Sequence, residues 1–268
     1  MHIHELPLFT KYNNKLVHGF SLKTGGVSQG CYASLNMGLH VGDTAAKVIT
    51  NRQLFCNALN INFENVVCCE QIHKDNIYTV TAADKGKGAH ELSTAIKNTD
   101  GLITNEKNIP LMLFFADCTP ILIYDTVNEA IGLAHAGWRG TIADIAGKTL
   151  QAMQAQYNTK PEECIAGIGP CIGQCCYEIG DDVRTQFTAV FSQIKKTTNA
   201  VDKILTYRNT AYLSLYDANK ILLIEHGILP ENISPEKEYC TSCHCTEFYS
   251  YRAAAGKTGR HAALLCLK

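Results

Sequence analysis

The sequence predicts one domain of the mixed α/β class. Apolar runs of strand length alternate with segments whose apolar residues repeat at helical spacing. At 268 residues and 46% hydrophobic composition, the chain is long enough to bury a sizeable core. No repeat, low-complexity run or Pro/Ser-rich linker divides the sequence. We therefore expect residues 1–268 to form a single unit.

The centre of the predicted sheet is a group of three strands. Leu111–Ala116 has almost no polar atoms, which predicts a buried strand that delivers Cys118 to a sheet edge. Ile121–Tyr124 and Ala130–Ala134 predict two more strands, and the short polar segment between them favours an antiparallel hairpin. The second strand of this hairpin would return His135 to the level of Cys118.

Upstream of these strands, the sequence predicts a loop system, a helix and a pair of strands. His18–Asp43 is rich in glycine and small polar residues, so it forms either structural turns or a loop that shapes a pocket. Ala45–Leu59 predicts a helix with Arg52 on its more polar side. Asn65–His73 predicts a strand that ends at its histidine, and Ile77–Val80 is its expected partner.

Downstream of the central strands, helices and strands alternate. Arg139–Tyr157 has the spacing of one amphipathic helix, and Cys164–Ile168 predicts a buried strand. A second helix is expected after Asp181, whose charge suits the positive end of a helix. Leu215–His226 predicts a third helix that stops at a glycine. Two final strands are expected at residues 247–252 and 261–267.

Charge and composition exclude several classes of partner. A net charge of -1 and a pI near 6.8 give no electrostatic footprint for nucleic acid or an anionic membrane, so a small ligand is favoured. No apolar run reaches the length of a membrane span, and the N-terminus lacks the features of a signal peptide. We expect a protein of the cytoplasm whose thirteen cysteines are reduced and form no structural disulfide.

Three residues that follow apolar runs carry the predicted chemistry: His73, Cys118 and His135. Histidine and thiolate are the preferred zinc ligands, and three protein ligands with one open position describe a catalytic zinc site. Cys118 could instead be a nucleophile with His135 as its base, or a buried apolar residue beside a turn histidine. Asp117 is either an orienting group or general acid, or a residue that forms the turn at the strand end.

A second group of cysteines competes as a metal site. Cys240–Cys245 contains the CxxC spacing of structural zinc sites, and its possible partners are Cys171, Cys175 and Cys176. Because a second CxxC is lacking, we favour thiols that pack at the edge of the site.

Motifs along the chain carry a resemblance to a known family. They are HGFSLKTGGVS, SLNMGLHVGD, CCEQIH, FADCTPILIYD, HAGWRGT, GPCIGQCCYEIG and CTSCHCTEFYSYR. In this order they resemble the multicopper polyphenol oxidoreductase, or laccase-domain, family, which is also described as bacterial purine nucleoside phosphorylases related to human FAMIN. The resemblance extends from His18 to Arg260. It implies that the family's metal ligands fall on His73, Cys118 and His135.

The resemblance also implies the layers of the fold and the reaction. It implies a domain with αββα-like layers and a cleft at the strand ends, and a zinc cofactor, with copper as a further possibility. The implied activities are phosphorolysis of adenosine, inosine, guanosine and S-methyl-5′-thioadenosine, and deamination of adenosine. The partners would then be purine nucleosides and phosphate, and we expect a monomer or a weak homo-oligomer.

The candidate substrate contacts come from four parts of the chain: Lys23, Ser34, Asn36, Arg52, Gln71 and Arg139. The family commonly has Arg at the position of Lys23. Lysine supplies charge for phosphate but not a bidentate fork, so Arg52 and Arg139 are the alternative phosphate contacts.

Two other enzyme classes remain open. A copper phenol oxidase would need many histidines for its further coppers, but the chain has 10, and its only His-x-His pair is His2–His4. A hydrolase that edits cell-wall precursors would use Cys118 and His135 without metal, so its activity would survive chelation. A binding module without catalysis explains paired Cys and His at strand ends least well.

Overall fold

The structure is a computed structural model, and it describes residues 2–235 and 239–268. Two sheets form its centre. The four-stranded sheet has the order β1 (Ile3–His4), β2 (Leu16–Ser21), β12 (His261–Leu267) and β5 (Leu111–Phe115). The five-stranded sheet has the order β3 (Ile77–Thr79), β4 (Gly101–Thr104), β7 (Ala130–Ala136), β6 (Thr119–Asp125) and β8 (Cys164–Ile168).

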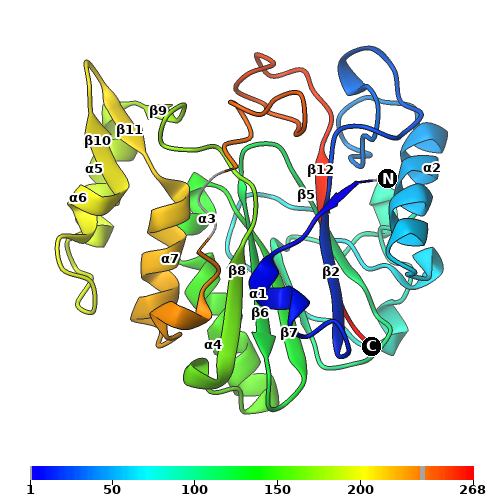
Figure 1. Cartoon of the computed structure of the whole chain (residues 1–268), viewed down its shortest axis with the longest axis horizontal. Helices are drawn as coiled ribbons and strands as arrows, with labels where there is room; N and C mark the ends of the chain where they lie inside the picture. The colour runs from blue at the N-terminus through cyan, green and yellow to red at the C-terminus, as the bar shows by residue number, and fades with distance from the viewer. Residues whose placement is uncertain (1, 236–238) are drawn as a thin grey trace.

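Helices cover the outer faces of the two sheets (Figure 1). Helix α2 (Ala45–Ala58) lies beside the four-stranded sheet, and α4 (Ile145–Tyr157) and α7 (Leu215–Glu225) lie on the side of the five-stranded sheet. The remaining elements are α1 (Pro7–Thr10), α3 (Trp138–Ile142), α5 (Asp181–Phe191), α6 (Ala200–Ile204) and a small sheet of β10 (Leu205–Tyr207), β11 (Ala211–Leu213) and β9 (Glu178–Ile179). The predicted fold class, a single mixed α/β domain with αββα-like layers, is confirmed.

Alternation of side chains along the central strands explains the layers. In β5, Leu111, Leu113 and Phe115 belong to the core between the two sheets. Met112 and Phe114 point the other way, into the core beneath α2. Both faces of this strand are therefore buried, as its unbroken apolar sequence predicted.

The predicted hairpin of β6 and β7 is confirmed, and its register sets the position of the site. The two strands pair antiparallel from Thr119 opposite Ala136 to Asp125 opposite Ala130. This register puts His135 opposite Pro120, close in the chain to Cys118. The polar segment between the strands turns on Asp125, whose carboxylate accepts hydrogen bonds from the following backbone.

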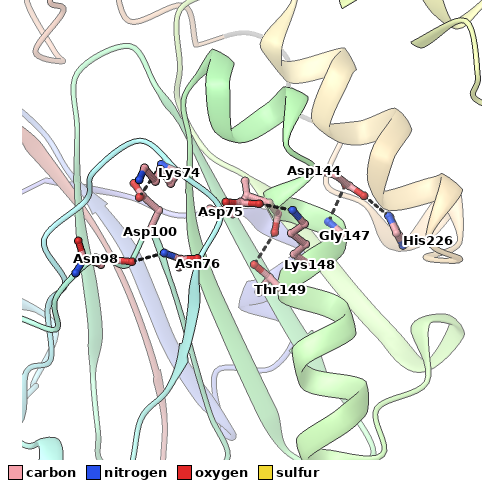
Figure 2. Close-up of polar contacts among 11 residues, drawn as sticks. Lys74, Asp75, Asn76, Asn98, Asp100, Asp144, Gly147, Lys148, Thr149 and His226 are labelled. Atoms are coloured by element: carbon pink, nitrogen blue, oxygen red, sulfur yellow. Dashed lines mark hydrogen bonds and ion pairs between the residues drawn. The ribbon is translucent and has the colours of Figure 1, made fainter. Parts of the chain in front are cut away.

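The helix predicted at Arg139–Tyr157 is broken in the structure. Asp144 adopts the left-handed conformation, with φ of 60°, and separates α3 from α4. Its carboxylate caps α4 by accepting a hydrogen bond from Gly147 N at 3.1 Å, and it also contacts His226 Nε2 at 2.5 Å (Figure 2). The break therefore lets one side chain join the start of α4 to the end of α7.

Three other sequence predictions are corrected. Asn65–His73 forms only isolated bridges, and β3, its expected partner, instead pairs in parallel with β4. Residues 247–252 form turns and irregular backbone instead of a strand, and the N–H of Arg252 donates to Asp117 at the site instead of to a neighbouring strand. The expected loop His18–Asp43 begins inside β2, which pairs with β12.

Arg52 does not lie on a polar side of α2. It is 1% exposed, and its guanidinium donates hydrogen bonds to the carbonyl oxygens of Met37, Gly88 and Ala89. The guanidinium also lies 4.2 Å from the ring centre of Phe114. Because these acceptors replace water, the buried cation can hold two loops against the helix.

Membrane crossing would require a long apolar helix. None of the helices formed by residues 2–235 and 239–268 has the necessary length and hydropathy.

Candidate metal centre

His73, Cys118 and His135 meet at one edge of the two-sheet core. Cys118 lies in the turn between β5 and β6, His135 lies in β7, and His73 comes from the loop before β3. One ligand atom from each of the three lies within 4.8 Å of the others. The centres of the two imidazole rings are 4.8 Å apart. The three side chains could therefore hold one metal ion, with two nitrogen ligands and one sulfur ligand.

Asp100, which the sequence analysis did not select, orients two of these residues. Its fully buried carboxylate lies 2.9 Å from His135 Nδ1, which leaves Nε2 of that ring free to face the other ligands. The same carboxylate accepts hydrogen bonds from the backbone N–H groups of Ile72, His73 and Lys74, at 3.0, 2.9 and 2.9 Å. Figure 2 shows the Asp100 carboxylate beside Lys74. One carboxylate thus fixes both histidine ligands.

The backbone around the site is constrained. His73 and Asp117 have φ values of 60° and 84°, in the left-handed region that residues with a Cβ seldom adopt. Gly137 faces the same space. A Cβ added there would lie 3.1 Å from Cys118 Sγ and 3.3 Å from His73 Cδ2. The absence of a side chain at Gly137 therefore leaves space beside Cys118 and His73.

Electrostatics favour an ionised thiol in the metal-free protein. Burial opposes ionisation of Cys118, but the charges and hydrogen bonds of His135 and His73 outweigh it and lower the pKa of this thiol to about 6. Burial likewise disfavours protonated His135, but the Cys118 thiolate and the Asp100 carboxylate raise its pKa to about 9. Thiolate is the form that binds metals and attacks electrophiles, so the geometry suits both readings of this cysteine.

In the metal-free protein, we expect Cys118 to be alkylated rapidly at neutral pH. Its lowered pKa makes thiolate the main form at pH 7, whereas an ordinary cysteine has a pKa of about 8.5. Iodoacetamide labelling with peptide mass mapping should show a rate that rises with a midpoint near pH 6. Added zinc should protect Cys118 and leave the exposed Cys31 unaffected. Labelling that begins only above pH 8, or that zinc does not slow, would contradict this arrangement.

A cavity of about 550 Å³ opens onto the three ligands. Of the substrate contacts predicted from sequence, Gln71 and Arg139 line it, as does Asp117. Sequence reasoning missed His40 and Arg260, which also line the cavity. His40 lies within the motif SLNMGLHVGD, so a signal for it was present in the sequence. Arg260 lies beyond the last motif, which ends at Arg252, and carried no such signal.

Gln71 and Asp117 also tie loops together at the cavity. The side-chain amide of Gln71 pairs with the backbone of Phe114, donating to its carbonyl oxygen at 2.7 Å and accepting from its N–H at 2.9 Å. Asp117 accepts hydrogen bonds from Thr241 Oγ1 at 2.7 Å and from Arg252 N at 2.6 Å. In this structure, both carboxylate oxygens of Asp117 anchor the C-terminal segment over the site.

The other predicted contacts lie away from the cavity lining. Lys23 Nζ donates to Cys245 O at 2.9 Å, and Ser34 Oγ accepts from Gly26 N at 3.1 Å. Arg52 is buried between its loops. Asn36 is buried behind the cavity, where its side-chain oxygen accepts a hydrogen bond from the backbone N–H of Arg260 at 2.9 Å. The structure therefore connects Asn36 to the cavity through one neighbouring residue.

Known proteins resemble the chain along nearly its whole length. YlmD of Bacillus subtilis, named a purine nucleoside phosphorylase, is 38% identical over 97% of this chain and 91% of its own. The crystal structure of YlmD from Geobacillus stearothermophilus has a TM-score of 0.90 at 38% identity, covering 98% of this chain and 94% of its own. The structure of hypothetical protein YfiH from Bacillus licheniformis gives 0.89 at 36% identity, with coverages of 97% and 94%. The family model described as multi-copper polyphenol oxidoreductase laccase matches residues 17–268. The chain therefore belongs to this family.

Proposed function

We propose that this protein is a zinc-dependent purine nucleoside phosphorylase of the cytoplasm. The observation that carries the proposal is the group of His73, Cys118 and His135 at the base of a cavity that is also lined by two arginines. Relatives such as YlmD carry the name purine nucleoside phosphorylase. The proposed substrates are adenosine, inosine, guanosine and S-methyl-5′-thioadenosine, with deamination of adenosine as a second activity.

The donor set supports zinc. Two imidazoles and one thiolate match its ligand preferences, and the Asp100–His135 contact is the outer-shell carboxylate that metal-binding histidines usually have. When bound, zinc supplies a Lewis acid at the base of the cavity. Among the described residues, the other ligand group contains only cysteines, so the histidines that further coppers would need are not gathered at a second site.

The cavity wall supports a nucleoside and phosphate as ligands. A volume of about 550 Å³ lies in the range of small-molecule sites, and Trp138, Tyr177 and Tyr251 provide aromatic surface for a purine. Arg139 and Arg260 provide the positive charge that phosphate needs. Burial lowers the pKa of Arg260, so an anion in the cavity would stabilise its charged form.

Different residues of the cavity would then have different roles in the reaction. Arg139 and Arg260 would bind and orient phosphate, so that one of its oxygens attacks C1′ of the ribose while the bond to the purine breaks. His40, at the cavity wall, has its pKa lowered to about 4, first by burial and then by the charges of Arg260 and Arg52. It is therefore neutral at pH 7 and can exchange a hydrogen bond with a nucleoside hydroxyl. Asp117, held by Thr241 and Arg252, would keep the cavity wall in place.

Nucleoside cleavage should require phosphate and yield ribose 1-phosphate. Removing a charged hydrogen-bond donor costs about 1.5–3 kcal/mol, so Arg139→Ala should lower kcat/KM for phosphate about 10- to 100-fold. Deamination of adenosine, which uses no phosphate, should change much less. Chromatography of the products with and without phosphate measures both reactions. Arg184→Ala is the matched control, because this arginine pairs with Asp181 at the start of α5 and lies outside the cavity lining.

The main competing function is a metal-free hydrolase that uses Cys118 and His135. The lowered pKa of Cys118 favours it, since a thiolate beside a protonated imidazole is an activated nucleophile. Chelation separates the two functions. Full activity after thorough removal of metal would exclude the zinc dependence, and free ribose released equally fast without phosphate would exclude the phosphorylase proposal.

A further inference from the structure

We propose that Cys175, Cys176, Cys240 and Cys243 form a second metal site, in which four thiolates hold a structural zinc ion outside the catalytic cavity. The sequence alone favours simple packing of these thiols, because only one CxxC is present. The structure supplies the missing pair from the adjacent cysteines at 175 and 176.

The sulfur positions fit one tetrahedral ion. One ligand atom from each of the four cysteines lies within 4.8 Å of the others. Cys243 Sγ lies 3.4 Å from Cys176 Sγ and 3.6 Å from Cys175 Sγ. A tetrahedral zinc site with Zn–S bonds of about 2.3 Å requires sulfurs about 3.8 Å apart. Small side-chain movements would therefore close the group around the ion.

Backbone hydrogen bonds prepare one of the sulfurs as a thiolate. Cys240 Sγ accepts from Gly173 N at 3.2 Å and from Cys243 N at 3.5 Å. Hydrogen bonds to the charged form of a group stabilise that form, and zinc binds cysteine as the thiolate. The two donors come from both of the segments that carry the cysteines.

The two segments are held at a fixed separation. Cys171 and Cys240 form a bridge between backbones, in which Thr241 N donates to Cys171 O at 3.0 Å. Gly173 lies against the thiols. A Cβ added there would approach Cys175 Sγ to 3.1 Å and Cys240 Cβ to 3.0 Å. The absence of a side chain at this position leaves room for the sulfurs to converge.

Packing alone explains this group poorly. Cys175 and Cys243 are exposed, whereas a structural cysteine that acts as a small apolar residue is usually buried. A single disulfide would use only two of the four sulfurs, and reducing compartments disfavour it. Four convergent thiols are the ligand set of closed structural zinc sites.

The proposed ion would stabilise the wall of the catalytic cavity. It joins the loop before α5 to the segment that begins at Cys240. This segment continues through Thr241 to Arg252, and both residues hold the Asp117 carboxylate beside Cys118. Arg252 also donates to the carbonyl oxygens of Cys176 and Glu178, at 3.2 and 3.0 Å. Zinc bound by the four thiolates would therefore hold in place the segment from Cys240 to Arg252, two residues of which hydrogen-bond to Asp117.

Metal counting on the full chain tests the proposal. Protein purified under reducing conditions, with zinc supplied, should contain about two zinc ions per chain when both sites bind. Cys243→Ser should lose one ion and keep the other. The matched control is Cys245→Ser, because this cysteine is exposed on the same segment but lies outside the group, and its variant should keep the full count.

The second site can also be identified from the atoms that surround its zinc ion. Cys118→Ser should leave only the ion held by the four cysteines, and X-ray absorption should then report zinc surrounded by four sulfurs and no nitrogen. This measurement does not depend on the folding of Cys243→Ser. It also separates this proposal from the enzyme proposal, whose ion has two nitrogen ligands.

Three results would overturn the second site. One is a Cys118→Ser protein that is folded, reduced and zinc-free after incubation with zinc. Another is a Cys243→Ser variant that keeps the full zinc count. The third is a mass shift that shows a disulfide among these cysteines in protein prepared under reducing conditions.

Discussion

Replacing Cys118 by serine should remove one metal ion and abolish nucleoside phosphorolysis. The hydroxyl has nearly the shape of the thiol but is a far poorer zinc ligand, and a site reduced from three ligands to two binds weakly. We expect turnover to fall by more than about 100-fold, in parallel with the loss of the ion at this site. Alanine at His73 or His135 should have the same double effect.

The fold should survive this change, because Cys118 lies in a turn at the edge of the core. Circular dichroism and thermal denaturation would check this, with Cys31→Ser as the control for loss of an exposed thiol away from the cavity lining. If the ion count does not fall in folded Cys118→Ser, the metal assignment is wrong. If the zinc-free variant still phosphorolyses adenosine, catalysis does not need the metal. Parallel loss in all three variants would distinguish one shared site from three independent roles.

Much of the central architecture is predictable because it is local in the sequence. The strands β5, β6 and β7 are short apolar runs separated by polar turns, and the hairpin register follows from the length of the turn. That register alone brings His135 near Cys118. The buried face of α4, with Ile145, Leu150 and Met153, likewise follows from helical spacing.

The parts that local patterns miss depend on contacts between distant segments. Arg52 looks like a surface charge, and only the carbonyl oxygens of two folded loops make its burial favourable. The spacing of apolar residues predicts one continuous helix, but the structure breaks it at Asp144. The carboxylate of Asp144 accepts a hydrogen bond from Gly147 N and contacts the ring of His226. The sequence placed His73 at a strand end, whereas the structure holds it in a loop.

The pairing of distant cysteines illustrates the same limit. A lone CxxC at Cys240 and Cys243 is weak evidence for a metal site. Its partners, Cys175 and Cys176, come from a loop far upstream, and a single sequence does not record which loop lies beside which. The thiol group becomes visible only when the fold brings the two segments together.

The carboxylate of Asp100 should matter as much as a metal ligand, and Asp100→Asn tests this with almost no change in shape. The carboxylate accepts four hydrogen bonds, three from backbone N–H groups and one from His135. An amide has only one oxygen, and its NH₂ would face donors. At least one of these partly or fully buried donors would lose its partner, so we expect the free energy of unfolding to fall by about 2–4 kcal/mol.

Asp100→Asn should lower the affinity for metal as well as the stability. The ring of His135 and the loop that carries His73 would both lose hydrogen bonds to the carboxylate. Loss of such an outer-shell partner typically lowers metal affinity about 10- to 100-fold. Competition with a chelator measures the affinity, and urea denaturation of the metal-free protein measures the stability separately. Asp75→Asn is the matched control, since Asp75 lies on the same loop but pairs with Lys148, whose side chain is partly exposed (Figure 2). That change should alter stability by no more than about 1 kcal/mol.

The stability difference between wild type and Asp100→Asn should also depend on pH. Burial alone would raise the pKa of Asp100, but hydrogen bonds from His135 and the backbone lower it below the ordinary value. A carboxyl whose pKa is lower in the folded state contributes its full stabilisation above the unfolded pKa of about 3.9. That contribution is lost as the pH falls through the folded pKa, so the two proteins should converge in strongly acidic solution. A difference that is the same at pH 7 and at pH 2, or a variant that binds zinc as tightly as wild type, would mean that Asp100 does not hold His73 and His135 in place.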